Sequence, residues 1–163
     1  MRKVALWFVL AAISFVVLDQ RAVACGCTAP PPIELAKKNA DLIFQGKVVG
    51  LRPGLNPPQI GQLMIDTGKV LVIRVVRVWK GDLPSTFEMP AWETAGACMG
   101  FSREHLQIGT ELLIYAKRWK RSDALAPFFM PDAYYTETPC SRTALVGQTK
   151  DLDSLGQGYP PKQ

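Results

Sequence analysis

Two cysteines separated by one glycine, Cys25-Gly26-Cys27, constrain the fold of this chain more than any other stretch of its sequence. They follow an apolar run from Val4 to Leu18, which two basic residues precede. Between the run and the cysteines lies Ala22-Val23-Ala24, a small-residue sequence typical of the sites that signal peptidase cuts. Cleavage after Ala24 makes Cys25 the first residue of the mature protein, with a free α-amino group.

A membrane anchor is the alternative interpretation of residues 1–24. The apolar run spans 15 residues, whereas a helix needs ~20 to cross a bilayer. We therefore predict a signal peptide over 1–24, no membrane span after its removal, and a secreted or periplasmic protein. A lipoprotein acylated at Cys25 is less favoured, because Ala22-Val23-Ala24 is a poor lipobox.

The mature chain has the size and charge of one small globular domain. Removing 24 of the 163 residues leaves 139, which is a usual domain length. The formal charge of +5 becomes +3, because Arg2, Lys3, Arg21 and Asp19 leave with the leader. So small an excess is not the footprint of a nucleic-acid-binding protein, and we expect no nucleic-acid partner.

All four cysteines, Cys25, Cys27, Cys98 and Cys140, belong to the mature chain. An even number of cysteines in an exported domain indicates two disulfides. Cys25 and Cys27 are too close in sequence to bond to each other, so both bond to Cys98 and Cys140, in either combination. A thiolate metal site is the weaker alternative, since the chain has no C-x-x-C pair and one histidine, His105. We expect no cofactor.

Sequence periodicity predicts a chain made mainly of short strands. Alternating or apolar runs indicate five strands. A proline precedes one expected helix, which an i,i+4 pair of Glu34 and Lys38 supports. Thr149 is the expected N-cap of a second, closed by Gly156. The predicted strands are 41–49, 70–79, 86–89, 112–117 and 128–135; the predicted helices are 33–39 and 149–155, with a loop over 52–62 and a frayed tail over 157–163.

Two of the predicted strands carry more specific expectations. In 41–49, one face holds Leu42, Phe44, Gly46 and Val48, so this face points inward, and the glycine indicates a bulge or bend. In 70–79 both faces are mostly apolar, with Arg74 and Arg77 interrupting one face each, which predicts a strand covered on both sides along much of its length. Together the elements indicate a small disulfide-linked β-barrel.

The chain resembles the N-terminal domain of the tissue inhibitors of metalloproteinases, which have an OB-fold of the netrin-like class. The resemblance begins with Cys25-x-Cys27 at the mature N-terminus and extends in order over nearly all of the mature chain. The other matching segments are Ala40–Lys47, Val76-x-x-Trp79-Lys80-Gly81, Ala97-Cys98-x-x-Phe101, Gly109, Glu111–Lys117 and Cys140.

The resemblance implies a mainly β fold: a five-stranded OB barrel over residues 25–156, with an N-terminal helix and a short C-terminal helix. It also implies the disulfides Cys25–Cys98 and Cys27–Cys140. The family's third disulfide in this domain and its C-terminal domain have no counterpart here, so the chain is similar to a short, bacterial-type member.

The resemblance further implies how the protein acts. In the family, the amine and carbonyl of the first residue chelate the catalytic zinc of a target metalloprotease, here through Cys25. The inhibitory ridge would comprise Cys25, Gly26, Cys27, Thr28 and the loop Thr94, Ala95, Gly96, Ala97. The partner is then a zinc metalloprotease, and the protein is a monomer. Gly26 departs from the family, because it has no side chain to enter the protease's first primed pocket.

A non-inhibitory netrin-like module that binds another envelope or extracellular protein is the alternative function. We do not expect an enzyme, because G-x-S-x-G, H-E-x-x-H and phosphate-binding glycine loops are absent from the sequence. His105 is expected at the surface. A structural role is expected for Ser141-Arg142-Thr143, with Arg142 in an ion pair near the bottom of the barrel.

Overall fold

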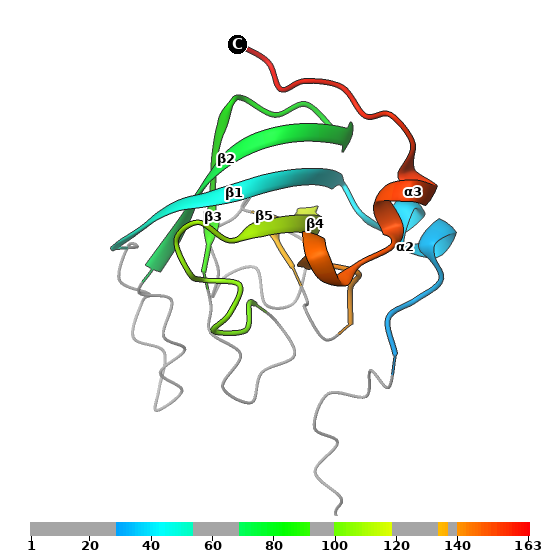
Figure 1. Ribbon diagram of the computed structural model, residues 1–163, viewed down its shortest axis with the longest axis horizontal. Helices are drawn as coiled ribbons and strands as arrows, with labels where there is room; N and C mark the ends of the chain where they lie inside the picture. Colours follow the sequence, from blue (N-terminus) through cyan, green and yellow to red (C-terminus); the bar gives the residue numbers. More distant parts are fainter. Residues whose placement is uncertain (1–28, 54–68, 92–99, 119–133, 137–139) are drawn as a thin grey trace, which may run out of the picture.

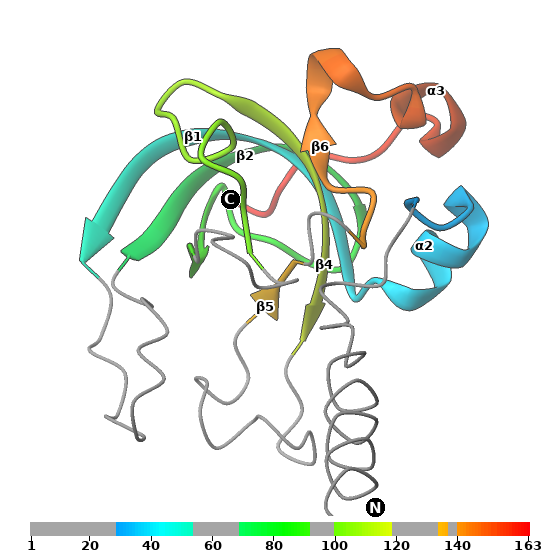
Figure 2. The same cartoon turned by 90° about the horizontal axis from the view of Figure 1, so that it is seen from below.

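The chain forms a curled antiparallel sheet with two short helices (Figures 1 and 2). The computed structural model describes residues 29–53, 69–91, 100–118, 134–136 and 140–163. Among these residues, no helix has the length and apolar character needed to cross a membrane. The elements are α2 (Ile33–Asn39), β1 (Leu42–Pro53), β2 (Lys69–Lys80), β3 (Thr86–Pro90), β4 (Glu111–Arg118), β5 (Tyr134–Tyr135), β6 (Ala144–Leu145), the 3-10 turn η2 (Val146–Gln148) and α3 (Asp151–Leu155).

The sheet curls into a half-barrel. Its strands lie in the order β3-β2-β1-β4-β5, and every strand pairing is antiparallel. Strand β5 pairs with the C-terminal end of β4, and β6 pairs with the N-terminal part of β4. The two outermost strands approach each other, since the rings of Phe87 and Tyr134 meet edge to face with centroids 5.7 Å apart. The mainly β prediction is therefore confirmed at the level of a curled antiparallel sheet.

The concave side of the sheet holds the main core. The alternation predicted for 41–49 is confirmed: Leu42, Phe44 and Val48 are buried there against residues of β2 and β4. The bend expected at Gly46 is also confirmed, because the β1–β2 register shifts between Gln45 and Gly46. A Cβ at Gly46 would collide with the Ile73 side chain, so only glycine fits this close approach of the two strands.

Helices cover one end of the convex side. Ile43, Leu113 and Tyr115 are buried there beneath α2 and α3, which lie beside each other in both views (Figures 1 and 2). The helix predicted over 33–39 is confirmed, but Glu34 pairs with Lys37, at 3.3 Å, and not with Lys38. The second helix begins at Asp151, two residues after the predicted N-cap, although Thr149 Oγ1 still accepts the Asp151 N–H at 3.1 Å.

The segment Trp79-Lys80-Gly81 joins the two helices to the sheet. Trp79 Nε1 donates to the carbonyl of Gly156 at 2.8 Å. Lys80 Nζ donates to the Lys37 carbonyl at 2.7 Å and to the Lys38 carbonyl at 3.3 Å, so its charge caps the C-terminal end of α2. Gly81 turns the chain with φ 83°, a conformation that favours glycine.

Strand β2 corrects one sequence prediction. We expected it to be covered on both sides along much of its length, but its convex face is open from Arg74 to Arg77: Val76 is 47% exposed, and Arg74 and Arg77 are exposed. The reason is a bulge, since Val75 pairs with Gly46 and Arg77 with Gln45, which leaves Val76 as an extra residue. Inward residues therefore resume at Val78, and Val76 and Arg77 both face outward.

The C-terminal tail is the second correction. We expected 157–163 to fray, but Tyr159 and Val78 exchange two backbone hydrogen bonds of 2.8 Å. The Lys162 N–H donates to the Leu83 carbonyl at 2.8 Å. The tail therefore satisfies backbone groups at the edge of β2 that β3 does not reach.

Smaller differences concern strand ends. Arg52 and Pro53 belong to β1, paired with Val70 and Lys69, and not to the predicted loop. The remainder of that loop lies outside the described residues, as does most of the predicted strand 128–135, whose last two residues form β5. Strand β6 was not predicted, because two residues are too few to show an alternation.

Candidate functional site

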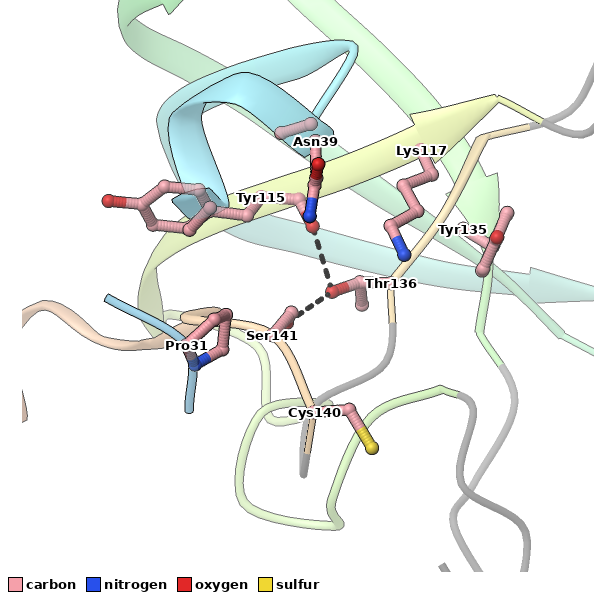
Figure 3. Close-up of a pocket in the computed structure, with 10 residues that line it drawn as sticks. Pro31, Asn39, Tyr115, Lys117, Tyr135, Thr136, Cys140 and Ser141 are labelled. Atoms are coloured by element: carbon pink, nitrogen blue, oxygen red, sulfur yellow. Dashed lines mark hydrogen bonds between the residues drawn. The ribbon is translucent and has the colours of Figure 1, made fainter. Parts of the chain in front are cut away.

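The predicted inhibitory ridge itself lies outside the described residues. This holds for Cys25, Gly26, Cys27 and Thr28, for the loop Thr94–Ala97, and for Cys98. The described residues nearest to the ridge in sequence are the segment from Pro31 into α2 and residues 140–145, which lie beside the end of β4 and residues 134–136. These elements surround a small pocket (Figure 3).

Buried hydroxyl groups hold the floor of this pocket together. Thr136 and Thr143 are 2% and 5% exposed, and their hydroxyl oxygens lie 2.7 Å apart. Thr136 Oγ1 donates to the Tyr115 carbonyl at 3.1 Å, and the Tyr115 N–H donates to Thr143 Oγ1 at 2.9 Å. The Ser141 hydroxyl lies 3.1 Å from Thr136 Oγ1 (Figure 3). Side chains thus satisfy the backbone of β4 at Tyr115, between its pairings with β6 and β5.

An ion pair between the half-buried Arg142 and the buried Asp151 ties these hydroxyl groups to both ends of the domain. Arg142 contacts both carboxylate oxygens of Asp151, through Nε at 2.6 Å and through Nη2. Its Nη1 donates to the carbonyl of Pro31 at 2.9 Å. The hydroxyl of Tyr115 donates to Asp151 Oδ2 at 2.9 Å. Arg142 therefore has the structural ion pair expected of it, and it also holds the segment that leads out of the predicted ridge.

The ion pair sets the charges of its members. Burial alone would raise the pKa of Asp151, but hydrogen bonds from Arg142 and Tyr115 outweigh it, so the pKa lies below its usual value. The hydrogen bond to Asp151 raises the pKa of Arg142. Burial, followed by the contact with Asp151, raises the pKa of the Tyr115 hydroxyl, so tyrosine stays a neutral donor.

The pocket has a volume of about 50 Å³ and is lined by Pro31, Ala36, Asn39, Ala40, Tyr115, Lys117, Tyr135, Thr136, Cys140 and Ser141. Sites for metabolites and drug-sized ligands measure about 300–1,000 Å³. This one has room for a few water molecules. The pocket is therefore too small for a ligand of that class.

Cys140 is not a free thiol. The other three cysteines lie outside the described residues. The pairings Cys25–Cys98 and Cys27–Cys140 therefore remain predictions.

His105 was expected at the surface, and this expectation is wrong. The side chain is 7% exposed, with its ring edge to face against Phe101 and its Nδ1 2.7 Å from the Ser102 hydroxyl. Burial lowers its pKa, and Glu104 partly offsets the effect. The histidine closes the turn that follows Phe101, where the Ser102 N–H also points at Nδ1 at 3.3 Å.

Sequence reasoning missed the partners of Arg142. Asp151 stands in the first turn of a predicted helix, where a carboxylate is ordinarily read as a helix-dipole contact at the surface. Thr136 directly follows the predicted strand 128–135 and Thr143 lies in no predicted element, so nothing in the pattern marked either as buried. Within the described residues, no group of three or more side chains has the makeup of a metal site.

Comparison with models of protein families and with curated proteins finds no match for this chain.

Proposed function

We propose that this chain is an exported metalloendopeptidase-inhibitor-like protein whose mature N-terminal residue, Cys25, chelates the zinc of a target protease. The ridge Cys25–Thr28 and the loop Thr94–Ala97 form the contact surface. The disulfides Cys25–Cys98 and Cys27–Cys140 hold this surface on a small OB-type barrel. The protein acts as a monomer and carries no cofactor of its own.

The observation that carries the proposal is the anchoring of Pro31. Its carbonyl accepts from Arg142 at 2.9 Å, two residues beyond Cys140, and Pro31 and Cys140 line the same pocket. Pro31 lies four positions after Cys27 in the chain, and an extended chain of that length reaches about 14 Å. The anchored position of Pro31 is therefore compatible with the Cys27–Cys140 bond that the resemblance implies.

The strand order also supports the proposal. An OB barrel is a five-stranded, partly open Greek-key barrel. Here β1 lies between β2 and β4, and the outermost strands β3 and β5 approach through Phe87 and Tyr134. This arrangement fits a five-stranded, partly open barrel to which β6 has been added.

The chemistry of chelation suits a terminal cysteine in a disulfide. An α-amine titrates at about 7.7–8.0, so its neutral form is accessible at small cost near neutral pH. Its nitrogen and the Cys25 carbonyl oxygen would take the position that catalytic zinc keeps open for water or substrate. A ridge fixed by two disulfides loses little conformational entropy on binding.

The experiment that tests the proposal adds one alanine before Cys25. The added residue removes the free amine from the metal while leaving every described strand and helix unchanged. Inhibition of a panel of zinc proteases is then expected to be lost in the extended protein, with an unchanged melting temperature. Inhibition by the native protein is expected to weaken as the pH falls below the amine's pKa, because a protonated amine does not coordinate.

Gly26 provides a second arm of the same experiment. Gly26→Val places a side chain in the first primed pocket of the protease and is expected to tighten inhibition by about 1–3 kcal/mol. Equal inhibition by the native and alanine-extended proteins, together with no gain from Gly26→Val, would contradict chelation. The alternative function would then be favoured, namely a netrin-like module that binds another envelope or extracellular protein. The lack of a side chain at Gly26 already favours this alternative.

A further inference from the structure

Part of the convex face of the sheet is basic and uncovered. It comprises Lys47 of β1 and Arg74, Val76 and Arg77 of β2, which we call the basic face. Helices α2 and α3 cover the neighbouring end of the same side, above Ile43, Leu113 and Tyr115 (Figure 2). The layer of helices therefore stops where the basic face begins.

The basic face holds two like charges opposite each other. Arg74 pairs directly with Lys47 across the antiparallel strands, and like charges in this position destabilise a sheet. The bulge at Val76 adds a third cation, because it turns Arg77 to the same side as Arg74. The fold thus concentrates positive charge where alternation alone would have separated it.

Nearby carboxylates do not neutralise these arginines. Glu111 lies 3.8 Å from Lys47, and Glu88 pairs with Arg52. Within the described residues, neither Arg74 nor Arg77 is in a salt bridge. Strand β2 itself contains four basic residues and no acidic one.

The face is also partly preorganised and partly apolar. Gly158 of the tail lies so close that a Cβ there would collide with the methylenes of Arg77, so the stem of this arginine packs against the tail backbone. Val76 is 47% exposed between the cations. An arginine whose stem is fixed by packing, next to an exposed apolar side chain, is typical of protein-binding surfaces.

We propose that the basic face is a docking surface for an acidic, amphipathic helix of a partner protein. Carboxylates on the helix would pair with Arg74 and Arg77, which bind carboxylates bidentately. Apolar side chains of the helix would cover Val76, and the helix would extend the layer begun by α2 and α3. The inference does not rest on the proposed inhibitory function, because it involves no residue of the predicted ridge.

The test uses the mature protein and a synthetic amphipathic helical peptide, with leucine along one face and glutamate along both flanks. Fluorescence anisotropy is expected to show binding that a glutamine version of the peptide lacks. Arg74→Ala with Arg77→Ala is expected to weaken binding about tenfold or more, since two charge-assisted contacts are lost. The control, Lys38→Ala with Lys69→Ala, removes the same charge from exposed sites elsewhere and is expected to bind normally.

Val76→Ser separates a protein partner from other polyanions. This substitution is expected to weaken binding of the peptide several-fold and to leave any binding of heparin or of phosphatidylglycerol vesicles unchanged. No binding of the acidic peptide, equal binding by both double variants, or tighter binding of heparin or vesicles than of the peptide would each overturn the proposal. The alanine-extended protein is expected to bind the peptide as the native one does. Loss of inhibition in that variant can therefore be distinguished from loss of peptide binding.

Discussion

At the scale of single residues, Asp151 is a buried carboxylate whose charge depends on its two hydrogen-bond donors. The residue is 3% exposed and accepts hydrogen bonds from Arg142 and Tyr115. Removing the charge of Asp151 leaves the half-buried Arg142 without its counter-ion, and removing Arg142 leaves the buried Asp151 uncompensated. Loss of the ion pair would also affect the segment at Pro31, because Arg142 donates a hydrogen bond to the Pro31 carbonyl.

We expect Asp151→Asn to destabilise the protein by about 3 kcal/mol at pH 7. The pKa of Asp151 is lowered in the fold, so its stabilising charge is present above the ordinary carboxyl value of about 3.9 and is lost as the pH falls through the folded pKa. The difference between wild type and variant should therefore shrink below pH ~4. Urea unfolding at neutral and acid pH measures it. Asp153→Asn, on the exposed side of α3, is the control, and an equal loss there would contradict the prediction.

At the scale of elements, helix α2 depends on a side chain from β2. The helix has seven residues, too few to be stable alone. Its C-terminal carbonyls receive the ammonium of Lys80, and Ala36 and Ala40 pack on the sheet. This explains why Lys80 stands at the end of the strand, directly before the turn at Gly81.

Lys80→Met keeps the length of the side chain and removes its charge. We expect it to lower the free energy of unfolding by about 1–2 kcal/mol, since two hydrogen bonds from a charged donor are lost at a helix C-terminus. Amide hydrogen exchange at Asn39 and Ala40 should quicken more than exchange in β1. Lys38→Met removes an equal charge from α2 without removing the cap. If both variants behaved alike, Lys80 would not be a cap.

The elements also show what sequence reasoning can reach. Helix α2 and strands β1 to β4 were predictable, because proline, glycine and apolar spacing report local structure directly. The bulge at Val76 was not, since an apolar residue gives no sign that its strand partner skips it. The pairing of the tail with Val78 and of Arg142 with Asp151 was also hidden. Both depend on which distant backbone groups are left unsatisfied, and no local pattern records this.

At the scale of the whole molecule, the tail completes the sheet. Tyr159 exchanges backbone hydrogen bonds with Val78, and its hydroxyl donates to the Gly81 carbonyl at 2.6 Å. An uncovered strand edge is a template for pairing with another chain. The tail therefore protects β2 as well as stabilising it.

We expect deletion of 157–163 to lower the free energy of unfolding by about 2–4 kcal/mol, at roughly 1 kcal/mol for each hydrogen bond lost. The shortened protein should also self-associate as its concentration rises, through the opened edge of β2. Thermal unfolding and sedimentation velocity measure the two effects. Deletion of the exposed Gln163 alone should change neither. A stable, monomeric protein lacking 157–163 would mean that the tail is dispensable.

The hydrogen bond between Pro31 and Arg142 can form only after both residues are available to fold. Its partners are 111 residues apart in the chain. If the chain crosses a membrane N-terminus first, the segment around Pro31 emerges long before the arginine that will fix it. Until then, every cysteine already delivered can form an early, exchangeable disulfide. If the proposed disulfides Cys25–Cys98 and Cys27–Cys140 form, refolding of the reduced protein should pass through mispaired disulfides that resolve once Arg142 binds the Pro31 carbonyl, and a disulfide isomerase should speed that step more than it speeds formation of the sheet.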